Sequence, residues 1–300
     1  MTVESSLQDA SELSSTLGSE FDIEVLQLTK GSFSGKLTSW ALPGVVVSHG
    51  HLERSVQISG VTNRDATLLL SKPDSKGQMV LNGTTLDRRD VLATPYRTEH
   101  RFVLPEEFHG IVLQLDHRLL SKTQFPPLQY LAEAHALWEF ACAVVKLGGE
   151  LDEKARESLG ARCIELVLQS QPPALADKAC TLSCRRRAAL QAADLIHEEP
   201  QAPLTMGVLC GHTHVGERTL RDGFIDVFGL PPMEYVLTVR LNLVRSRLRG
   251  GGPQLTVARA ATELGFWHLA RFAGFYRGFF GELPSETLRR ATALNSAENG

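Results

Sequence analysis

The pattern of apolar and polar positions divides the chain into a strand-like part and a helical part. Short aliphatic runs bounded by turn residues fill the first part, and such runs are typical of β-strands. They are Val45–Val47, Thr67–Leu70, Gln78–Leu81, Thr84–Leu86, Val91–Thr94 and Gly110–Leu115. Asn82-Gly83 between two of these runs favours a type I′ hairpin turn, because both residues tolerate positive φ. The pattern therefore predicts a β-sandwich or barrel of many short strands.

The spacing of apolar residues changes to a helical period between residues 124 and 170. The first stripe is Leu128, Leu131, His135, Trp138, Cys142 and Val145, and the second is Ala155, Leu159, Cys163 and Leu166. Two amphipathic helices are expected here. The first stripe is either a core face or a dimerisation seam, and the second interpretation places Leu131, Trp138 and Val145 in a homodimer interface.

The C-terminal hundred residues contain one pattern twice, in which a short helix and a turn precede a second helix. Thr205 is expected to cap the first helix and Gly216 to begin the second. Leu209, Val215, Leu220 and Phe224 would form the core of this first unit. In the second unit, Val257–Phe266 is the helix and turn, and His268–Phe280 follows with Leu269, Phe272, Phe275 and Tyr276 inward. A long helix over Met233–Arg249 joins the two helix-turn-helix units and stops at a glycine run.

These C-terminal residues resemble the AraC/XylS family of transcription regulators. The first motif is Glu217–Arg221 with Phe224 and Phe228–Pro232, and the second is Gly265–Ala273 with Tyr276-Arg277, Phe280-Gly281 and Pro284-Ser285. The sequence departs from the usual pattern at His214, where a glycine is common, and at Gly216, where a serine is common. Both replacements are compatible with the fold, because glycine caps helices acceptably and histidine tolerates positive φ better than most residues.

The resemblance implies an α+β protein with two domains. Residues 21–117 would be a cupin-like β-barrel or sandwich that binds a small-molecule effector, and residues 118–170 a helical dimerisation segment. Residues 171–184 are expected to be a linker before the all-α DNA-binding domain at 185–290, with flexible tails at 1–20 and 291–300. The partners implied are double-stranded DNA, RNA polymerase, the effector and a second copy of the chain. Activation is the expected outcome, and no cofactor is expected.

Charge is distributed unevenly along the chain. Residues 185–290 hold 14 Arg, no Lys and 10 acidic residues, whereas the rest has 17 basic and 24 acidic residues. Such an asymmetry indicates either a nucleic-acid-facing C-terminal part or a chance surplus. Arginine reads guanine in the major groove from the N-terminal half of a recognition helix. The candidates are Arg218, Thr219, Arg221 and Asp222 in the first helix, and Trp267, His268, Arg271 and Arg277 in the second.

Several candidates carry a structural alternative. Arg277 is better suited to phosphate than to bases, and Trp267 is either a base contact or a packing aromatic. Arg240, Arg245, Arg247 and Arg249 on the joining helix either pair internally or span phosphates and the two subdomains. Arg185-Arg186-Arg187 is either a solvated helix start or a DNA arm. Trp40 and His51 are candidate effector-pocket residues, with ordinary packing or exposure as the alternative.

Two sets of residues are candidate metal ligands. One is His49, His51, Glu53, His100 and His109, and the other is Cys210, His212 and His214. Glu53 follows His51 too closely for the usual cupin pattern, so no metal is expected. The rival hypothesis is a cupin-fold metal-dependent enzyme or sensor with an appended DNA-binding domain. No nucleophile elbow is present, so we expect no enzyme. The lack of a signal peptide or a long apolar run predicts a cytoplasmic protein with no membrane span, and five cysteines without a Cys-x2-Cys pair suit a reducing compartment.

Overall fold

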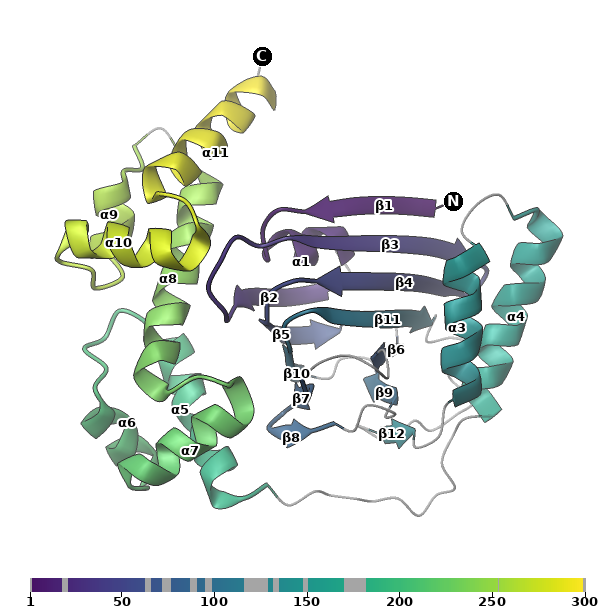
Figure 1. The fold of residues 1–300 in the computed structure, drawn as a ribbon, viewed down its shortest axis with the longest axis horizontal. Coiled ribbons are helices and arrows are strands. Elements are labelled where there is room, and N and C mark those ends of the chain that lie inside the picture. Colours follow the sequence, from purple (N-terminus) through teal and green to yellow (C-terminus); the bar gives the residue numbers. More distant parts are fainter. Residues whose placement is uncertain are drawn as a thin grey trace. The chain divides into compact units, whose positions relative to one another are not determined.

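The computed structural model describes residues 2–17, 21–62, 66–71, 77–86, 91–94, 99–115, 129–131, 135–147, 151–169, 182–252 and 254–298. The chain forms two compact units (Figure 1). The first consists of Met1–Val25 and Ser34–Cys180, and the second of Leu26–Phe33 and Thr181–Gly300. The predicted α+β class with two domains is confirmed. In the described residues, every helix is too short or too polar to cross a membrane.

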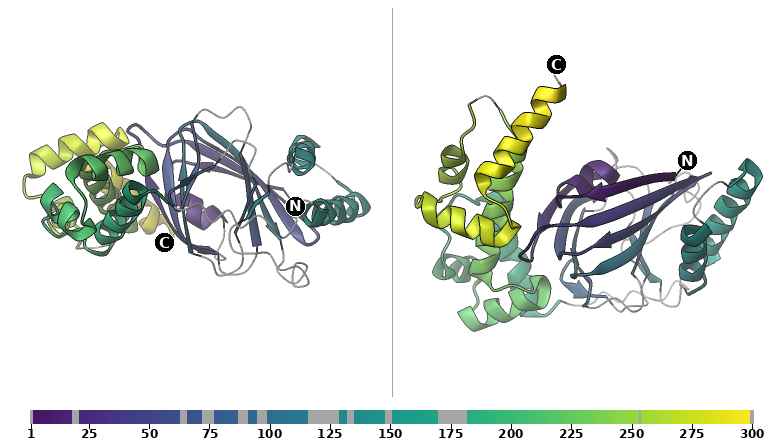
Figure 2. Two further views of the ribbon diagram at one scale, coloured as in Figure 1. Left: turned by 90° about the horizontal axis from the view of Figure 1, so that it is seen from below. Right: turned by 45° about the horizontal axis from the view of Figure 1, so that its top comes forward.

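The first unit is built from two antiparallel sheets that face each other (Figure 2). The larger sheet has the order β1 (Thr2–Leu7), β3 (Gly35–Leu42), β4 (Val45–Leu52), β11 (Phe108–Leu115), β6 (Ala66–Ser71), β9 (Val91–Thr94) and β12 (Gln129–Leu131). The smaller sheet has the order β2 (Phe21–Gln27), β5 (Val56–Thr62), β10 (Glu99–Leu104), β7 (Val80–Leu81) and β8 (Thr84–Thr85). Each aliphatic run named above therefore lies in a strand or just beside one.

The predicted hairpin at Asn82-Gly83 is confirmed. Strand β7 pairs with β8 so that Leu81 lies opposite Thr84. Asn82 has φ 46° and Gly83 has φ 78°, and two consecutive positive φ values define the type I′ turn. The Asn82 side chain also accepts a 2.8 Å bond from the Arg101 amide, which ties the hairpin to β10.

The prediction of a flexible tail at 1–20 is wrong for residues 2–17, and a helix extends into the tail predicted at 291–300. Residues Thr2–Leu7 form β1, which pairs with β3 along its whole length, and α1 (Glu12–Leu17) follows. At the other end, α11 runs from Pro284 to Glu298. The order of β1 was missed because a polar, Ser-rich segment gains it by pairing with β3, which its own composition does not show. Most of the predicted linker at 171–184 lies outside the described residues.

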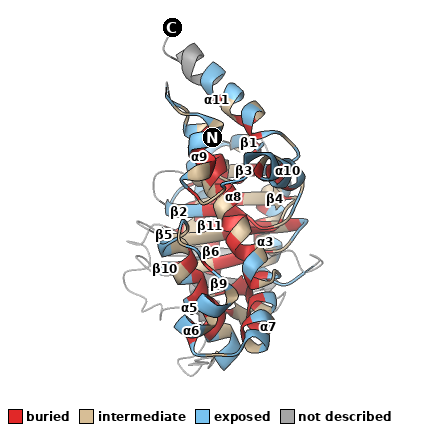
Figure 3. Ribbon diagram, turned by 90° about the vertical axis from the view of Figure 1, so that its left-hand side faces the viewer, coloured by how far each residue is buried: buried red, intermediate tan, exposed pale blue. Residues whose placement is uncertain are grey.

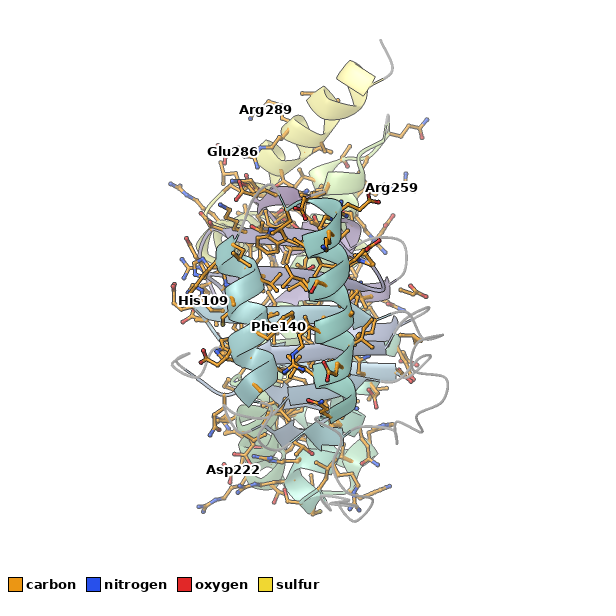
Figure 4. The ribbon with its side chains drawn as sticks, turned by 90° about the vertical axis from the view of Figure 1, so that its right-hand side faces the viewer. His109, Phe140, Asp222, Arg259, Glu286 and Arg289 are labelled. Atoms are coloured by element: carbon orange, nitrogen blue, oxygen red, sulfur yellow. The ribbon has the colours of Figure 1, made fainter. Side chains whose placement is uncertain are left out.

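Helices α3 (His135–Leu147) and α4 (Glu153–Gln169) lie side by side against strands β3, β4 and β11, with Phe140 labelled in Figure 4. Their shared core combines aliphatic strand residues with Leu137, Ala141, Val144, Cys163, Leu166 and Val167. Burial raises the pKa of the Cys163 thiol to about 12, as expected for a thiol in an apolar core.

The predicted first helix is too long at its N-terminal end. Leu131 belongs to β12, where it pairs with Val91, and the helix begins at His135. The helical spacing of apolar residues extends from Leu131 to the helix that begins at His135. Leu131 is nevertheless extended, because it pairs with β9. Leu128 lies outside the described residues. Trp138 and Val145 are half-buried beside the core stripe of Leu137, Ala141 and Val144.

The second unit is helical from Cys184 onward. Its helices are α5 (Cys184–Glu198), α6 (Met206–Thr213), α7 (Glu217–Phe228), α8 (Pro232–Gly250), α9 (Val257–Thr262), α10 (Leu269–Phe280) and α11. Helix α8 is largely buried (Figure 3) because both halves of the unit pack on it. Its N-terminal part contributes Tyr235, which contacts Phe224 and Phe228 of α7. Its C-terminal part enters a separate core with Phe272 and Tyr276 of α10.

The two helix-turn-helix units repeat the same local chemistry. Thr205 and Thr256 cap α6 and α9 by accepting a bond from the amide three residues on. The turns then reach positive φ at His214 (55°) and Gly265 (81°). The predicted roles of Thr205 and His214 are thus confirmed, and Gly216 is the N-cap of α7 without a side-chain bond. Recognition helices α7 and α10 both end at a glycine with φ near 75°, as the values of 71° and 78° show.

Gly223 sets how closely α7 approaches α5, and its replacement tests this packing. A Cβ at this position would lie 2.1 Å from the Arg185 carbonyl oxygen, whereas a Cβ on Gly274 of α10 would meet nothing within 4 Å. We expect Gly223→Ala to lower the free energy of unfolding by about 1–3 kcal/mol through overpacking. Gly274→Ala, the control, should raise it by about 0.5–1 kcal/mol, since alanine favours a helix. Urea unfolding followed by circular dichroism measures both, and equal effects would show that Gly223 is not a packing constraint.

Candidate nucleic-acid interface

Helix α7 has one buried face and one face open to a ligand. Leu220, Gly223, Phe224, Val227 and Phe228 are buried against the rest of the unit. On the other side, Arg218 and Arg221 are exposed, and Thr219 and Asp222 are half-buried. The four predicted residues therefore share the accessible N-terminal half of the helix. This is the part of a recognition helix that contacts base edges in helix-turn-helix proteins.

Helix α10 is arranged in the same way. Phe272, Tyr276, Phe279 and Phe280 are buried, and Trp267, His268, Arg271 and Arg277 are all exposed. Trp267 is 76% exposed just before the helix, so its interpretation as a packing aromatic is wrong.

The expectation that Leu269 and Phe275 point inward is also wrong, since they are 40% and 39% exposed. The buried stripe follows Phe272, Tyr276 and Phe279 at the helical period, and Leu269 and Phe275 lie beside it.

The arginines of the open faces differ from those of the scaffold in their partners. Within the described residues, no acidic side chain lies within ion-pair distance of Arg218, Arg221, Arg271 or Arg277. The N–H donors of these side chains are therefore available for an external acceptor. Phosphate oxygens and guanine O6/N7 are such acceptors.

The arginines of α8 make internal bonds instead. Arg240 donates to the carbonyl oxygens of Pro200 and Ala202 at 2.7 and 2.6 Å, and Arg247 pairs with Glu263 at 2.7 Å. Arg185 and Arg186 at the start of α5 pair with Asp226 of α7 at 2.6 and 3.7 Å. Of the two interpretations, internal pairing is the one observed for Arg240, Arg245 and Arg247, and these bonds join segments that flank the recognition helices.

A buried polar cluster around Arg245 holds α10 and α11 on α8. Arg245 donates to Glu282 at 2.8 Å, and its guanidinium lies 4.4 Å from the ring centroid of Phe280. Thr287 donates to the same Glu282 oxygen at 2.8 Å and lies 2.9 Å from the Tyr276 hydroxyl. Burial raises the pKa of that hydroxyl above its ordinary value, so it stays protonated and can act as a donor.

Two surface features of α10 were not predicted. The Arg271 guanidinium lies 5.2 Å from the ring centroid of Phe275, one turn further along the same face, and such stacking restricts the arginine without neutralising it. Gly274 and Gly278 are exposed on this helix, and an added Cβ would meet nothing within 4 Å at either. No contact inside the protein requires these glycines, although each costs helix stability. A signal for them existed in the sequence, as glycines inside a predicted helix.

The histidines of the first unit are only partly brought together. His51 and His109 are cross-strand partners with stacked rings 4.0 Å apart, and His49 stacks on His109 at 6.3 Å (Figure 4 labels His109). His100 lies on β10 of the other sheet. Among the described residues, no three His, Cys, Asp or Glu side chains are placed together to hold a metal ion. In α6, burial and then the Glu217 carboxylate raise the pKa of the Cys210 thiol above its ordinary value.

The two candidate pocket residues lie in the larger sheet but not beside each other. Trp40 lies opposite Val47 of β4, and His51 follows Val47 by an even number of residues on the same strand. Both side chains therefore share one face of the sheet. Val47 and His51 are four residues apart on β4, which corresponds to roughly 13 Å. Trp40 is 7% exposed and its indole Nε1 has no acceptor among the described residues.

These faces define a tandem helix-turn-helix domain in which α7 and α10 present arginines that have no acidic partner among the described residues. Residues 209–290 match the family described as a helix-turn-helix domain. Over 99 residues the chain is 35% identical to a probable thc operon regulatory protein of Rhodococcus erythropolis. The matched stretch covers 33% of this chain and 30% of that protein. Over 74 residues it is 43% identical to XylDLEGF operon transcriptional activator 3 of Pseudomonas putida, and this match covers 24% of this chain and 22% of that protein. The chain thus carries an AraC/XylS-type domain at its C-terminal end, and the match spans less than a third of these relatives' length.

The chain is also similar to parts of two solved structures. A probable AraC family transcriptional regulator from Rhodopseudomonas palustris is 36% identical, with 35% of this chain and 97% of that chain covered and a TM-score of 0.33. The AraC-like transcriptional activator CuxR is 14% identical, with 80% and 94% covered and a TM-score of 0.45.

The buried ion pair of Arg245 yields a stability prediction. Glu282→Gln leaves the Arg245 charge without its carboxylate in a buried site, so we expect a loss of about 3–5 kcal/mol in the free energy of unfolding. Glu263→Gln removes the exposed pairs to Arg247 and Arg259 and should cost at most about 1 kcal/mol. Chemical denaturation of both variants provides the comparison. Similar small losses would show that the buried pair contributes no more than a surface pair.

Proposed function

We propose that this protein is a sequence-specific DNA-binding transcription regulator that contacts two successive major grooves with α7 and α10. The observation that carries the proposal is the division of arginines in the second unit. Among the described residues, the arginines on the open faces of α7 and α10 have no acidic partner, whereas Arg240, Arg245 and Arg247 of α8 are bonded internally. The identity to operon regulators in this region supports it.

The length of α8 supports contact with two grooves. A helix of 19 residues spans roughly 28 Å. Successive major-groove faces on one side of B-DNA lie about 34 Å apart. Since α8 packs on α7 with one end and on α10 with the other, it separates the recognition helices by a distance of this order.

The roles of individual residues follow from their chemistry and exposure. Arg218 and Arg221 of α7 and Arg271 of α10 are proposed to bond guanine edges, and Arg277 to bond phosphate. The other proposed base or backbone contacts are Thr219, Asp222, Trp267 and His268. Phe275 holds Arg271 through its ring and is a positioning residue.

The first unit is proposed to sense a small-molecule effector and to mediate dimerisation. Relatives of the C-terminal domain are named transcriptional activators, so activation with RNA polymerase as a partner is the proposed outcome. The dimer seam would use the half-buried edge of α3 with Trp138 and Val145. Leu131 belongs to β12 and does not extend this helix face.

The base-contact assignment predicts different effects for different arginines. Arg221→Ala and Arg271→Ala should each cost about 1–3 kcal/mol on preferred DNA and relax base preference at separate positions. Arg277→Ala should weaken binding to all sequences alike and reduce the salt dependence by about one counterion. Fluorescence anisotropy on fragments that the protein selects from a random pool, and on random fragments, measures both effects at several salt concentrations.

Arg247→Ala is the matched control, since Arg247 is bonded to Glu263. It should change DNA affinity less than the other three variants. Equal losses on selected and random DNA for Arg221→Ala and Arg271→Ala would contradict base contact and leave phosphate contact as their role.

The dimer proposal predicts that Trp138→Glu yields a monomer, because a carboxylate on the seam opposes association of two apolar surfaces. Ala143→Glu makes the same change on an exposed part of α3 away from Trp138 and should leave the dimer intact. Sedimentation velocity of the full chain distinguishes the two states. A dimer that survives Trp138→Glu would place the interface elsewhere.

A further inference from the structure

The compact unit that contains the DNA-binding helices also includes a segment from the beginning of the chain. Residues Leu26–Phe33 belong to this unit together with Thr181–Gly300. The segment begins with the last two residues of β2 and ends just before β3. Its apolar side chains Leu26, Leu28 and Phe33 are buried, with Leu28 only 1% exposed. It is therefore part of the packed unit and not a loop in solvent.

One end of the segment is held by the side chain of Asn242 on α8. Asn242 Oδ1 accepts from the Gln27 amide at 3.0 Å, and Nδ2 donates to the Gln27 carbonyl at 2.9 Å. The amide of one side chain thus pairs with both backbone groups of one residue, as a neighbouring strand would. Gln27 donates to the carbonyls of Thr29 and Gly31 at 2.7 Å each, which fixes the shape of the segment.

The other end of the segment contacts α10. The Gly31 amide donates to the Phe279 carbonyl at 2.7 Å. Ser32 lies so close to Gly281, the C-cap of α10, that a Cβ on this glycine would be 2.5 Å from the Ser32 hydroxyl oxygen. Lys30 also forms an exposed pair with Glu234 of α8 at 3.3 Å. The segment thus connects α8 with the C-terminal end of α10.

We propose that Asn242, Phe279 and Gly281 form a docking site for the chain's own segment Leu26–Phe33, and that docking fixes α10 relative to α8. The proposal rests on the proposed function, because its consequence concerns DNA. Docking sets the distance between the two recognition helices and hence the spacing of the two base-contact sites. Release of the segment permits other spacings. Since β2 ends at Gln27 and β3 begins at Gly35, a displacement of either strand acts directly on the segment.

Two glycines provide a matched test of docking in the full chain. Gly281 and Gly229 are the C-caps of α10 and α7 with φ of 78° and 71°, so alanine introduces the same backbone strain at both. A Cβ collides with Ser32 only at Gly281, because Gly229 has nothing within 4 Å. Asn242→Ala removes the contact at the other end of the segment independently.

Hydrogen exchange is the first measurement and does not depend on DNA. We expect the Gly31 amide to exchange about tenfold faster or more in Gly281→Ala, because displacement of the segment breaks its bond to the Phe279 carbonyl. The Gln27 amide should do the same in Asn242→Ala, because it loses its Asn242 Oδ1 acceptor. Gly229→Ala should leave both amides unchanged. Unchanged exchange in Gly281→Ala and Asn242→Ala, or equal acceleration in Gly229→Ala, would overturn the docking site.

The second measurement tests the consequence for DNA. The probes are fragments selected by the wild-type chain from a random pool, remade with two base pairs inserted between the two contacted grooves. The insertion should weaken wild-type and Gly229→Ala binding by about tenfold or more, since it rotates one groove away from the other. In Gly281→Ala and Asn242→Ala the penalty should fall to about threefold or less. Faster exchange with an unchanged penalty would overturn the claim that docking fixes the spacing. Failure of the wild type to select any fragment would refute the proposed function, while exchange still reports on docking.

Discussion

The packing of both helix-turn-helix units on the single helix α8 is the constraint on which the proposed DNA-binding surface depends. Tyr235 near one end completes the aromatic core under α7, and Leu241, Val244 and Leu248 near the other end complete the core under α10. Neither recognition helix could keep its open face oriented without this shared support. Arg245 adds a charged bond to Glu282 in the buried part of the second core, where loss of one partner is far more costly than on a surface.

Charge is used in two different ways on this scaffold. Arginines that stabilise the unit are bonded to carboxylates or backbone carbonyls, as Arg240 and Arg245 are. Arginines on the open faces lack such partners among the described residues, as Arg221 and Arg271 do. A net charge of −3 for the whole chain conceals this difference. The positive surplus of the C-terminal part has functional meaning only because the structure shows which guanidinium groups are still available.

The elements that the sequence predicted well are those determined by local chemistry. Thr205 as a cap, His214 at positive φ and the Asn82-Gly83 turn each follow from the preferences of a few adjacent residues. The candidates Arg218, Arg221, Trp267 and Arg271 could be placed because helical periodicity separates an open face from a buried one. The position of Phe275 was not predicted. An aromatic residue next to a buried stripe is expected in the core, whereas Phe275 is exposed and stacks with Arg271.

The remaining errors come from contacts between residues far apart in sequence. Strand β1 pairs with β3, Leu131 pairs with β9 as part of β12, and Gln27 at the end of β2 is bonded by Asn242. Residues that pair over such separations carry no local signature, because the free energy that orders them comes from the partner.

Hydroxyl-radical footprinting of the full chain on fragments selected from a random pool tests the central claim most directly. If α7 and α10 enter successive major grooves, each bound monomer should protect two patches on one face of the duplex, about 10 bp apart. A single protected patch per monomer would contradict the account, because it would mean that only one of the two helices contacts DNA.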